Sequence, residues 1–304
     1  MKNSSKLIDL SSRGSSSSRE LWAKEDPMGL RINTNVTSLA AQRTLSANNK
    51  QQASTLGKLS SGSRIVRAAD DAAGLAISEK LKAQIRGMNQ AERNANDGIS
   101  LIQTAEGGLS EVSNILTRLR ELSIQSASDT VGQPERAFVN LEYQNLKQEI
   151  ERISQVTEFN GKKLLNGEGD KYDFQIGINN DDFQDRIKYR ANLTNSTMDS
   201  LGISEIAVDA KVGAQESLAV LDSAIQKISG QRAELGAVQN RLTSTVQNLQ
   251  VASENLNAAN SQIRDTDFAS ETASNTKLNI LTNAGTSVLS QANASGQAAL
   301  KLIG

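Results

Sequence analysis

Residues 77–122 read ISEKLKAQIRGMNQAERNANDGISLIQTAEGGLSEVSNILTRLREL and carry one unbroken apolar stripe. Its members are Ile77, Leu81, Ile85, Met88, Ala91, Ala95, Ile99, Ile102, Ala105, Leu109, Val112, Leu116, Leu119 and Leu122. They span 45 residues in 13 steps, or about 3.5 residues per step, which is the period of a left-handed coiled-coil seam. The stretch therefore predicts a long helix that packs against a partner along one face.

A second stripe of the same length and period lies in the C-terminal half of the chain. Its members are Leu218, Leu221, Ile225, Ile228, Arg232, Leu235, Val238, Leu242, Val246, Leu249, Ala252, Leu256, Ala259 and Ile263. Two equal stripes predict two helices packed along their full extent, each roughly 65–70 Å long at 1.5 Å per residue. The alternative is a set of shorter helices broken at glycines, because each interior glycine costs about 1 kcal/mol against alanine. Such glycines are Gly98, Gly107 and Gly108 in the first stripe and Gly230 and Gly236 beside the second. The unbroken phase across these glycines favours long helices.

A third helix and a strand pair are predicted between the two stripes. The helix begins near Pro134, and its apolar face comprises Phe138, Leu141, Leu146, Ile150, Ile153 and Val156. Alternating apolar residues then mark two strands: Tyr172, Phe174, Ile176 and Ile178, followed by Ile187, Tyr189, Ala191 and Leu193. We therefore expect a β-hairpin region at about 160–200. The acidic loop 179–185 lacks the spacing of a calcium-binding loop, so we interpret it as a solvated turn.

The composition excludes several kinds of chemistry. The 304 residues include no His and no Cys, which removes imidazole bases, thiol nucleophiles and the common zinc ligands. The carboxylate pairs Asp70-Asp71 and Asp181-Asp182 are better explained as helix starts and turns than as acid–base pairs. A net charge of -1 argues against a nucleic-acid partner, and no run approaches the roughly 18 apolar residues of a membrane span. We predict no enzyme activity, no cofactor, no metal and no membrane insertion.

The two ends of the chain carry weaker amphipathic stripes that are rich in small residues. Isolated helices of this kind are marginal in water, so their apolar faces need a partner. We therefore expect the ends to become ordered when copies of the chain assemble. The candidate assembly residues are Val36, Leu39, Leu56, Leu59, Leu278, Leu281, Val288, Ala292 and Leu302.

Residues 1–27 differ from the rest of the chain. They hold the only Trp, Trp22, and a serine-rich tract, and they lack the apolar segment of a secretory signal peptide. Two interpretations remain open: a disordered N-terminal extension with a function of its own, or a mis-assigned start with Met28 as the true first residue. Under either interpretation the segment stands outside the fold.

Several longer motifs occur in the order found in bacterial flagellins. They are MGLRINTN at 28–35, LSSG at 59–62, DDAAG at 70–74, RNANDGIS at 93–100, AGTSVL at 284–289 and QAN at 291–293. By these motifs the chain resembles a bacterial flagellin over roughly residues 28–165 and 215–304. The resemblance implies a mainly α fold: a long antiparallel coiled-coil and helical-bundle rod with a small β-hairpin region and without outer variable domains. It also implies a terminal coiled-coil domain that forms the inner filament tube, residues 28–72 plus 264–304, and a core helical domain, residues 73–263.

The same resemblance implies a secreted structural subunit of the flagellar filament. Such subunits pass through the flagellar type III export pathway and self-assemble through both terminal helices into a helical propeller for motility. The implied partners are other copies of the chain, a flagellar export chaperone, and cap and junction proteins. Two alternatives remain: a hook–filament junction protein of the same family, and a soluble coiled-coil adaptor that stops at a dimer.

The resemblance further implies an innate-immune receptor contact on the core helices. The family pattern falls on Arg118, Leu122 and Glu142, so Toll-like receptor 5 is an expected partner. The alternative is that Leu122 fills the helix seam while Arg118 and Glu142 make filament contacts.

Overall fold

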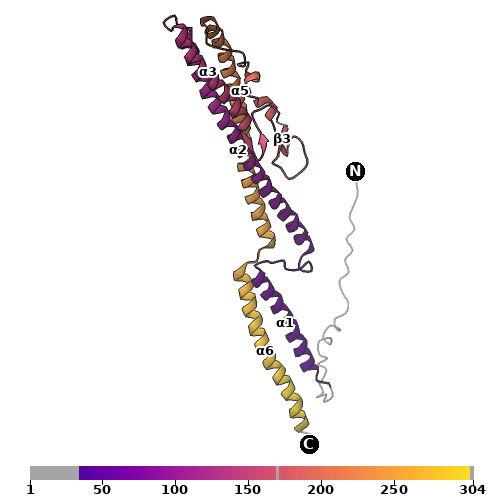
Figure 1. Ribbon diagram of the computed structural model, residues 1–304. Helices are drawn as coiled ribbons and strands as arrows, with labels where there is room; N and C mark the ends of the chain where they lie inside the picture. The colour runs from indigo at the N-terminus through magenta and orange to yellow at the C-terminus, as the bar shows by residue number, and fades with distance from the viewer. Residues whose placement is uncertain (1–33, 169–170, 302–304) are drawn as a thin grey trace, which may run out of the picture. The chain divides into compact units, whose positions relative to one another are not determined.

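The computed structural model describes residues 34–168 and 171–301 (Figure 1). The extension at 1–27 and Leu302 therefore lie outside the described residues. The described residues divide into two compact units, a terminal unit that contains residues 34–62 and 266–301, and a core unit that contains residues 63–168 and 171–265. Each unit is built around one antiparallel pair of helices.

The terminal unit pairs α1, Val36–Ser61, with α6, Phe268–Lys301. Helix α1 begins at Asn35, whose side-chain Oδ1 accepts a hydrogen bond from the Ser38 amide at 3.0 Å. The helix ends at Gly62, which adopts the left-handed backbone conformation with φ 67°. The pair is antiparallel, because α1 starts beside Ala292 of α6 and its last turn lies beside Glu271.

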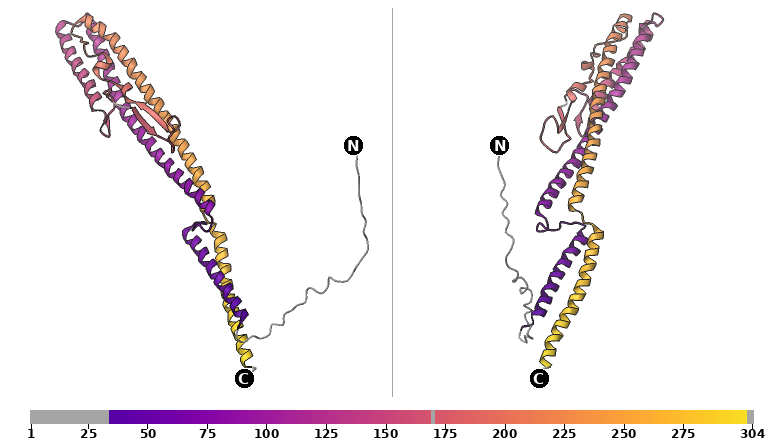
Figure 2. Two further views of the ribbon diagram at one scale, coloured as in Figure 1. Left: turned by 90° about the vertical axis from the view of Figure 1, so that its right-hand side faces the viewer. Right: turned by 180° about the vertical axis from the view of Figure 1, so that it is seen from behind.

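The core unit is organised by α2, Ala72–Ala127, and α5, Lys211–Arg264. Helix α2 starts at Asp71, whose Oδ1 accepts from the Gly74 amide at 2.8 Å. The two helices run antiparallel along their length, as Figures 1 and 2 show. The prediction of two long, unbroken helices is confirmed, since the glycines inside both stripes remain helical.

The seam between α2 and α5 follows the predicted stripes closely. Leu109, Leu116 and Leu119 of α2 and Leu221 and Leu235 of α5 are fully buried. Ile77, at the N-terminal end of the α2 stripe, is instead half-exposed. The seam is therefore tight along most of its length and opens near the end where α2 begins.

Helix α3, Gln133–Val156, packs on α2 with a face that differs from the predicted one. Its buried residues are Tyr143, Lys147, Ile150 and Ser154, whereas Phe138, Leu141 and Val156 are exposed. The polar members of this face bond to backbone groups: the Lys147 ammonium donates to the Ser204 and Ile206 carbonyls, and the Ser154 hydroxyl donates to the Leu165 carbonyl. The apolar pattern alone therefore assigned part of this face wrongly.

Two small antiparallel strand pairs follow α3. Strands β1, Glu158–Phe159, and β2, Lys162–Lys163, are joined by Asn160 and Gly161, which have φ values of 49° and 76°. A turn with both central residues at positive φ favours the Asn-Gly dipeptide.

The predicted hairpin consists of β3, Lys171–Gln175, and β4, Arg186–Arg190. Phe174 is paired with Ile187 in the register, and the hairpin lies against α2 and α5 (Figure 2). The Phe174 ring lies 3.0 Å from the position of a Cβ added at Gly98, so glycine permits this close approach.

A short return segment connects the hairpin to α5. It contains a 3-10 turn, Ala191–Thr194, and α4, Met198–Leu201. No further domain is inserted between β4 and α5. The expected fold class is confirmed: mainly helical, with one β-hairpin region and no outer domain.

Candidate assembly surfaces

The seam between α1 and α6 has the spacing of a coiled coil but an unusually polar content. Less exposed positions with a regular spacing are Ser38, Ala41, Leu45, Asn48, Gln52, Thr55 and Leu59 in α1 and Glu271, Asn275, Leu278, Thr282, Gly285, Leu289 and Ala292 in α6; Gly57, Lys58 and Ser274 are also half-buried. Steps of three and four alternate along both sets, which is the a/d pattern of a heptad repeat. Bulky aliphatic side chains occupy only a minority of these positions.

Polar contacts join the two helices along this seam. The Asn35 side-chain amide donates to the Ala292 carbonyl at 2.8 Å, and the Ser38 hydroxyl donates to the Asn293 side chain at 2.8 Å. At the opposite end, Lys58 and Glu271 form an ion pair of 3.9 Å. Each such contact contributes only about 0.5–1.5 kcal/mol net, because it replaces hydrogen bonds to water. The helix pair therefore has a weakly apolar interior.

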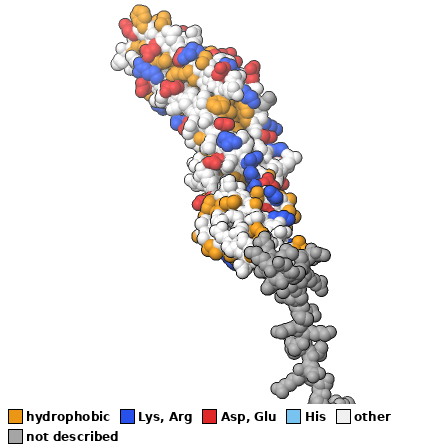
Figure 3. All heavy atoms as spheres, turned by 90° about the horizontal axis from the view of Figure 1, so that it is seen from below, with side chains coloured by type: hydrophobic (Ala, Val, Ile, Leu, Met, Phe, Trp, Pro, Cys, Tyr) orange, Lys and Arg blue, Asp and Glu red, His pale blue; other side chains and the backbone are white. Residues whose placement is uncertain are grey.

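Bulky aliphatic side chains instead point outward from both helices. Those with the largest exposed fractions, between 41% and 63%, are Val36, Leu39 and Leu56 of α1 and Ile280, Leu281 and Val288 of α6. We call these six residues the outer apolar face. Figure 3 shows apolar side chains in orange reaching the surface among charged and polar groups. These exposed side chains make α1 and α6 a candidate surface for contact with another chain.

The predicted assembly residues separate into two groups. Val36, Leu39, Leu56, Leu281 and Val288 belong to the outer apolar face. Leu278 is buried within the pair, while Leu59 and Ala292 are half-buried in its seam, so these three residues hold α1 and α6 together. Ile280 was missed by the sequence analysis, because it lies one position off the stripe that was followed.

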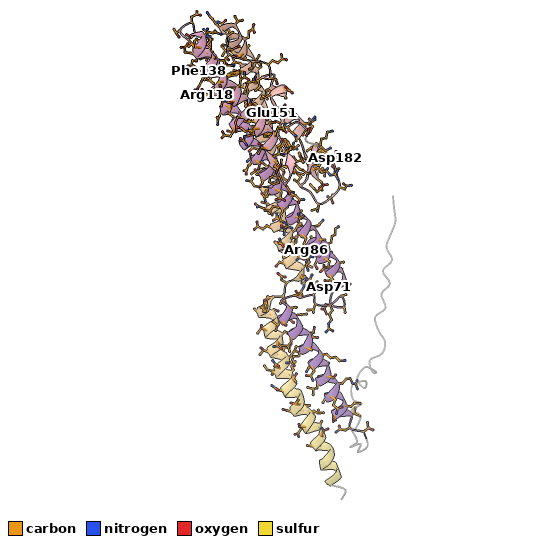
Figure 4. All side chains as sticks on the ribbon, in the orientation of Figure 1. Asp71, Arg86, Arg118, Phe138, Glu151 and Asp182 are labelled. Atoms are coloured by element: carbon orange, nitrogen blue, oxygen red, sulfur yellow. The ribbon has the colours of Figure 1, made fainter. Side chains whose placement is uncertain are left out.

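The residues of the expected receptor contact occupy two environments. Arg118 of α2 pairs with Glu142 of α3 through an Nη2–Oε1 distance of 3.0 Å and with Glu121 through 3.0 Å. The hydrogen bonds that Arg118 donates to Glu121 and Glu142 raise the pKa of Arg118. Leu122, by contrast, is only 1% exposed and belongs to the core. The structure thus pairs Arg118, labelled in Figure 4, with Glu142 on the surface, whereas Leu122 is buried.

The acidic loop between β3 and β4 uses its carboxylates for internal bonds. Asp181 Oδ1 accepts from the Phe183 amide at 2.9 Å and from the Gln184 amide at 2.8 Å, and these bonds lower the pKa of Asp181. Asp182 pairs with Lys188 and Arg186, and the Lys188 hydrogen bond lowers the pKa of Asp182. The loop is therefore a rigid, hydrogen-bonded turn.

Two strongly exposed aromatic residues of the core unit escaped the sequence analysis as candidate surface residues. Phe183 lies at the tip of the acidic loop and is 92% exposed, and Phe138 on α3 is 76% exposed. The signal for Phe183 was available, because it is a lone aromatic residue in a polar loop. Phe138 was assigned to a buried helix face, which concealed it.

Across residues 34–168 and 171–301, none of the helices combines the length and the hydropathy that a bilayer crossing requires.

Comparison with known proteins gives two family regions in chain order. The bacterial flagellin N-terminal helical region matches residues 32–170, and the bacterial flagellin C-terminal helical region matches residues 218–303. The flagellin of Halalkalibacterium halodurans is 46% identical over 274 residues, covering 90% of this chain and 99% of the relative. The flagellar filament 33 kDa core protein of Treponema phagedenis is 42% identical over 288 residues, with the same shares covered.

A solved structure shares the fold at low sequence identity. It is a putative flagellar hook-associated protein from Vibrio parahaemolyticus, with a TM-score of 0.54 and 13% identity, covering 64% of this chain and all of that one. At this identity the likeness concerns the fold alone. The family regions and the full-length relatives together confirm the resemblance found in the motifs: the chain belongs to the bacterial flagellins, the structural subunits of the flagellar filament.

Proposed function

We propose that copies of this chain join into the extracellular filament by burying the outer apolar face of the terminal unit between neighbours. The proposal rests on where polar and aliphatic side chains lie in the α1–α6 pair: many polar ones lie in the seam, and many aliphatic ones are exposed. Its seam holds Ser38, Asn48 and Thr55, while Leu39 and Ile280 face outward. A single copy leaves these aliphatic side chains in water, and assembly removes them from it.

The energetic balance favours assembly over a stable isolated pair. Full burial of a Val, Leu or Ile side chain contributes about 1.5–3 kcal/mol, so burying the remaining half of each outer residue adds roughly 1 kcal/mol per side chain. Repeated contacts along a filament offset the conformational entropy lost when the helices become fixed. The core unit has its own buried seam and does not depend on this gain.

Open-ended growth requires that the contact between copies be heterologous. A two-fold contact stops at a dimer, whereas two different surfaces that do not close into a ring produce a helical filament. We assign the inner filament tube to α1 and α6 and the surrounding wall to the core unit. The segment 63–71 groups with the core unit, since Ile65 is buried close to Gly74 at the start of α2.

Three finer assignments are part of the proposal. An export chaperone covers the outer apolar face before assembly, and the cap and junction proteins meet the same terminal helices at the ends of the filament. Toll-like receptor 5 contacts the exposed Arg118–Glu142 pair of a single subunit. This contact is supported by the exposure of both side chains, about half for each. Leu122 acts indirectly, because its burial in the core holds this part of α2 in place. The role of the chain is structural, without catalysis.

Seeded polymerisation of a Leu39→Ser/Ile280→Ser variant tests the proposal. We expect the variant to keep the melting temperature of the core unit and to fail to extend preformed filament seeds. Ser287→Ala on α6 is the matched control, because Ser287 bonds only to the Asn283 carbonyl of its own helix. Normal elongation by the double variant would overturn the proposed mechanism.

A further inference from the structure

Three dipeptides in the chain place a glycine directly after an asparagine or an aspartate. They are Asn160-Gly161, Asn166-Gly167 and Asp97-Gly98. Glycine has no Cβ, so its backbone nitrogen approaches the preceding side chain with the least obstruction. Attack by this nitrogen on the side-chain carbonyl carbon makes such residues chemically labile, and the surroundings of each dipeptide decide whether it reacts.

Asn160 and Gly161 form the exposed turn between β1 and β2, with φ values of 49° and 76°. Within residues 34–168 and 171–301, no hydrogen bond holds the Asn160 side chain. A Cβ added at Gly161 would meet nothing within 4 Å, so the turn has open space around it. The Asn160 side-chain amide is therefore free to rotate toward the Gly161 nitrogen.

This turn also opens easily, because the strands that it joins are short. Strands β1 and β2 pair through Glu158 with Lys163 and through Phe159 with Lys162 alone. A two-stranded pair of this length is marginal in water, and local opening of such elements needs little free energy. Phe159 packs half-buried against the core, so the segment stays attached while the turn itself opens.

Asn166-Gly167 has the same sequence but is held in place. The Asn166 side-chain amide donates to the Glu168 carboxylate at 3.0 Å, and the Glu168 backbone amide donates to Asn166 Oδ1 at 3.1 Å. A Cβ at Gly167 would clash with the Asn195 side-chain amide, which therefore covers the glycine. The preceding Leu165 is fully buried. Rotation of the Asn166 side chain toward the glycine nitrogen thus requires the loss of several contacts.

Asp97-Gly98 lies inside α2 and is protected by the helix. Backbone N–H groups within an α-helix donate to carbonyls four residues earlier, so the Gly98 nitrogen is already engaged. Gly98 is also buried next to the Phe174 ring. Three similar dipeptides therefore differ sharply in their exposure and their hydrogen bonds.

We propose that Asn160 is a site of spontaneous chemical modification in the folded subunit, through attack by the Gly161 backbone nitrogen. A bond forms between this nitrogen and Asn160 Cγ, the Cγ–Nδ2 bond breaks, and the proton of the attacking nitrogen leaves with the amide as ammonia. Water then opens the cyclic imide at either of its carbonyl carbons, which gives aspartate or isoaspartate. The inference is independent of the proposed function, because no second copy takes part.

The two products affect the turn differently. Aspartate tolerates the left-handed conformation much as asparagine does, so this product keeps the turn. Isoaspartate carries an extra methylene group in the main chain, and a turn of two residues between paired strands does not accommodate it. The register of Phe159 with Lys162 is then lost.

Peptide mass spectrometry of the full chain tests the proposal. The purified protein is kept below its melting temperature in a mildly alkaline buffer, because the attacking nitrogen must lose its proton, and samples are digested with trypsin. Cleavage after Lys and Arg places Asn160 in the peptide 153–162 and Asn166 in the peptide 164–171, so one sample reports on both sites. Relative to the zero-time sample, the deamidated fraction should grow about tenfold faster in 153–162, since that ratio needs only a modest difference in the free energy of local opening.

The same incubation in urea separates the effect of the fold from that of the sequence. Unfolding removes the contacts of Asn166, so both peptides should then be deamidated at similar rates. Equal rates in the folded chain, or a faster reaction at Asn166, overturn the proposal. A preference for Asn160 that persists undiminished in urea also overturns it, because the fold would then not be its cause.

A variant tests the protection of the second site. Glu168→Ala removes the carboxylate that accepts the Asn166 amide hydrogen bond. Deamidation in the peptide 164–171 should become severalfold faster, while the rate in 153–162 stays unchanged as the internal control. An unchanged rate at Asn166 contradicts the proposed reason for the difference between the two sites.

Discussion

Ser217 of α5 donates a hydrogen bond of 2.9 Å to Ser123 of α2, and both hydroxyl groups are fully buried in the core unit. Ser123 donates its own proton to the Leu119 carbonyl, and the Ala214 carbonyl, 2.8 Å from the Ser217 hydroxyl, is an alternative acceptor for the single proton of Ser217. This polar bridge lies among evenly spaced aliphatic residues of the seam, which also holds the buried Gln231 and a hydrogen bond from Ser253 to Asn89. A seam of that kind tolerates sliding by one heptad, and a buried polar pair specifies one register.

Loss of one hydroxyl from this bridge should destabilise the core unit modestly. We expect Ser123→Ala and Ser217→Ala each to lower the free energy of unfolding by about 1 kcal/mol. The double variant should lose less than the sum, since neither partner is then left unpaired. Urea unfolding followed by circular dichroism measures all three values, and strict additivity would show that the two hydroxyls are not coupled.

Replacement of the buried lysine of α3 should be more damaging. Lys147 is 3% exposed, and its ammonium donates to the Ser204 and Ile206 carbonyls at 2.8 and 2.9 Å. Lys147→Met removes both bonds and leaves two carbonyl groups without this donor. We expect a loss of about 2–3 kcal/mol in the free energy of unfolding. An unchanged melting temperature would show that the lysine does not hold the return segment.

The same lysine should make stability depend on alkaline pH. Burial lowers the pKa of Lys147 below its ordinary value of 10.5. Between the lowered value and 10.5 the unfolded chain binds more protons than the folded one, so the free energy of unfolding rises with pH in that window. Lys147→Met should lack this rise, while the exposed Lys80→Met should keep it. Parallel pH profiles for all three proteins would contradict the assignment.

Two helix glycines should respond in opposite directions to alanine. An alanine Cβ at Gly98 would lie 3.0 Å from the Phe174 ring, whereas one at Gly230 meets nothing within 4 Å. Gly230→Ala should stabilise the isolated subunit by up to about 1 kcal/mol through helix propensity. Gly98→Ala should lose that gain and more, because the hairpin must move away. Thermal unfolding of both variants measures the two effects. Equal stabilisation by both changes would mean that the hairpin is free to shift.

Much of the core unit could be predicted from the sequence because its apolar period is regular. The stripes from Leu81 to Leu122 and from Leu221 to Leu242 correspond to the observed α2–α5 seam. The strand alternation around Phe174 and Ile187 likewise predicted the hairpin. In the helix pair and in the hairpin alike, the structure is determined by burial of apolar side chains within one chain.

The remaining features could not be predicted, for two physical reasons. The inner face of α3 uses Lys147 and Ser154 to bond backbone groups of distant segments, and a period of apolar residues does not reveal such bonds. In α1 and α6 the apolar residues mark the intramolecular seam only in part, since Leu59 and Leu278 lie in it while several others do not. Leu39 and Ile280 face outward, so a rule that places apolar residues inside one chain fails there.

The central claim is that the outer apolar face of α1 and α6 becomes buried between copies. A cryo-electron-microscopy map of filaments grown from the purified chain tests it most directly. The account predicts that Leu39, Ile280, Leu281 and Val288 lie against helices of neighbouring copies, out of contact with solvent. A map in which these side chains remain exposed in the assembled filament, while other surfaces of the terminal unit make the contacts, would contradict it.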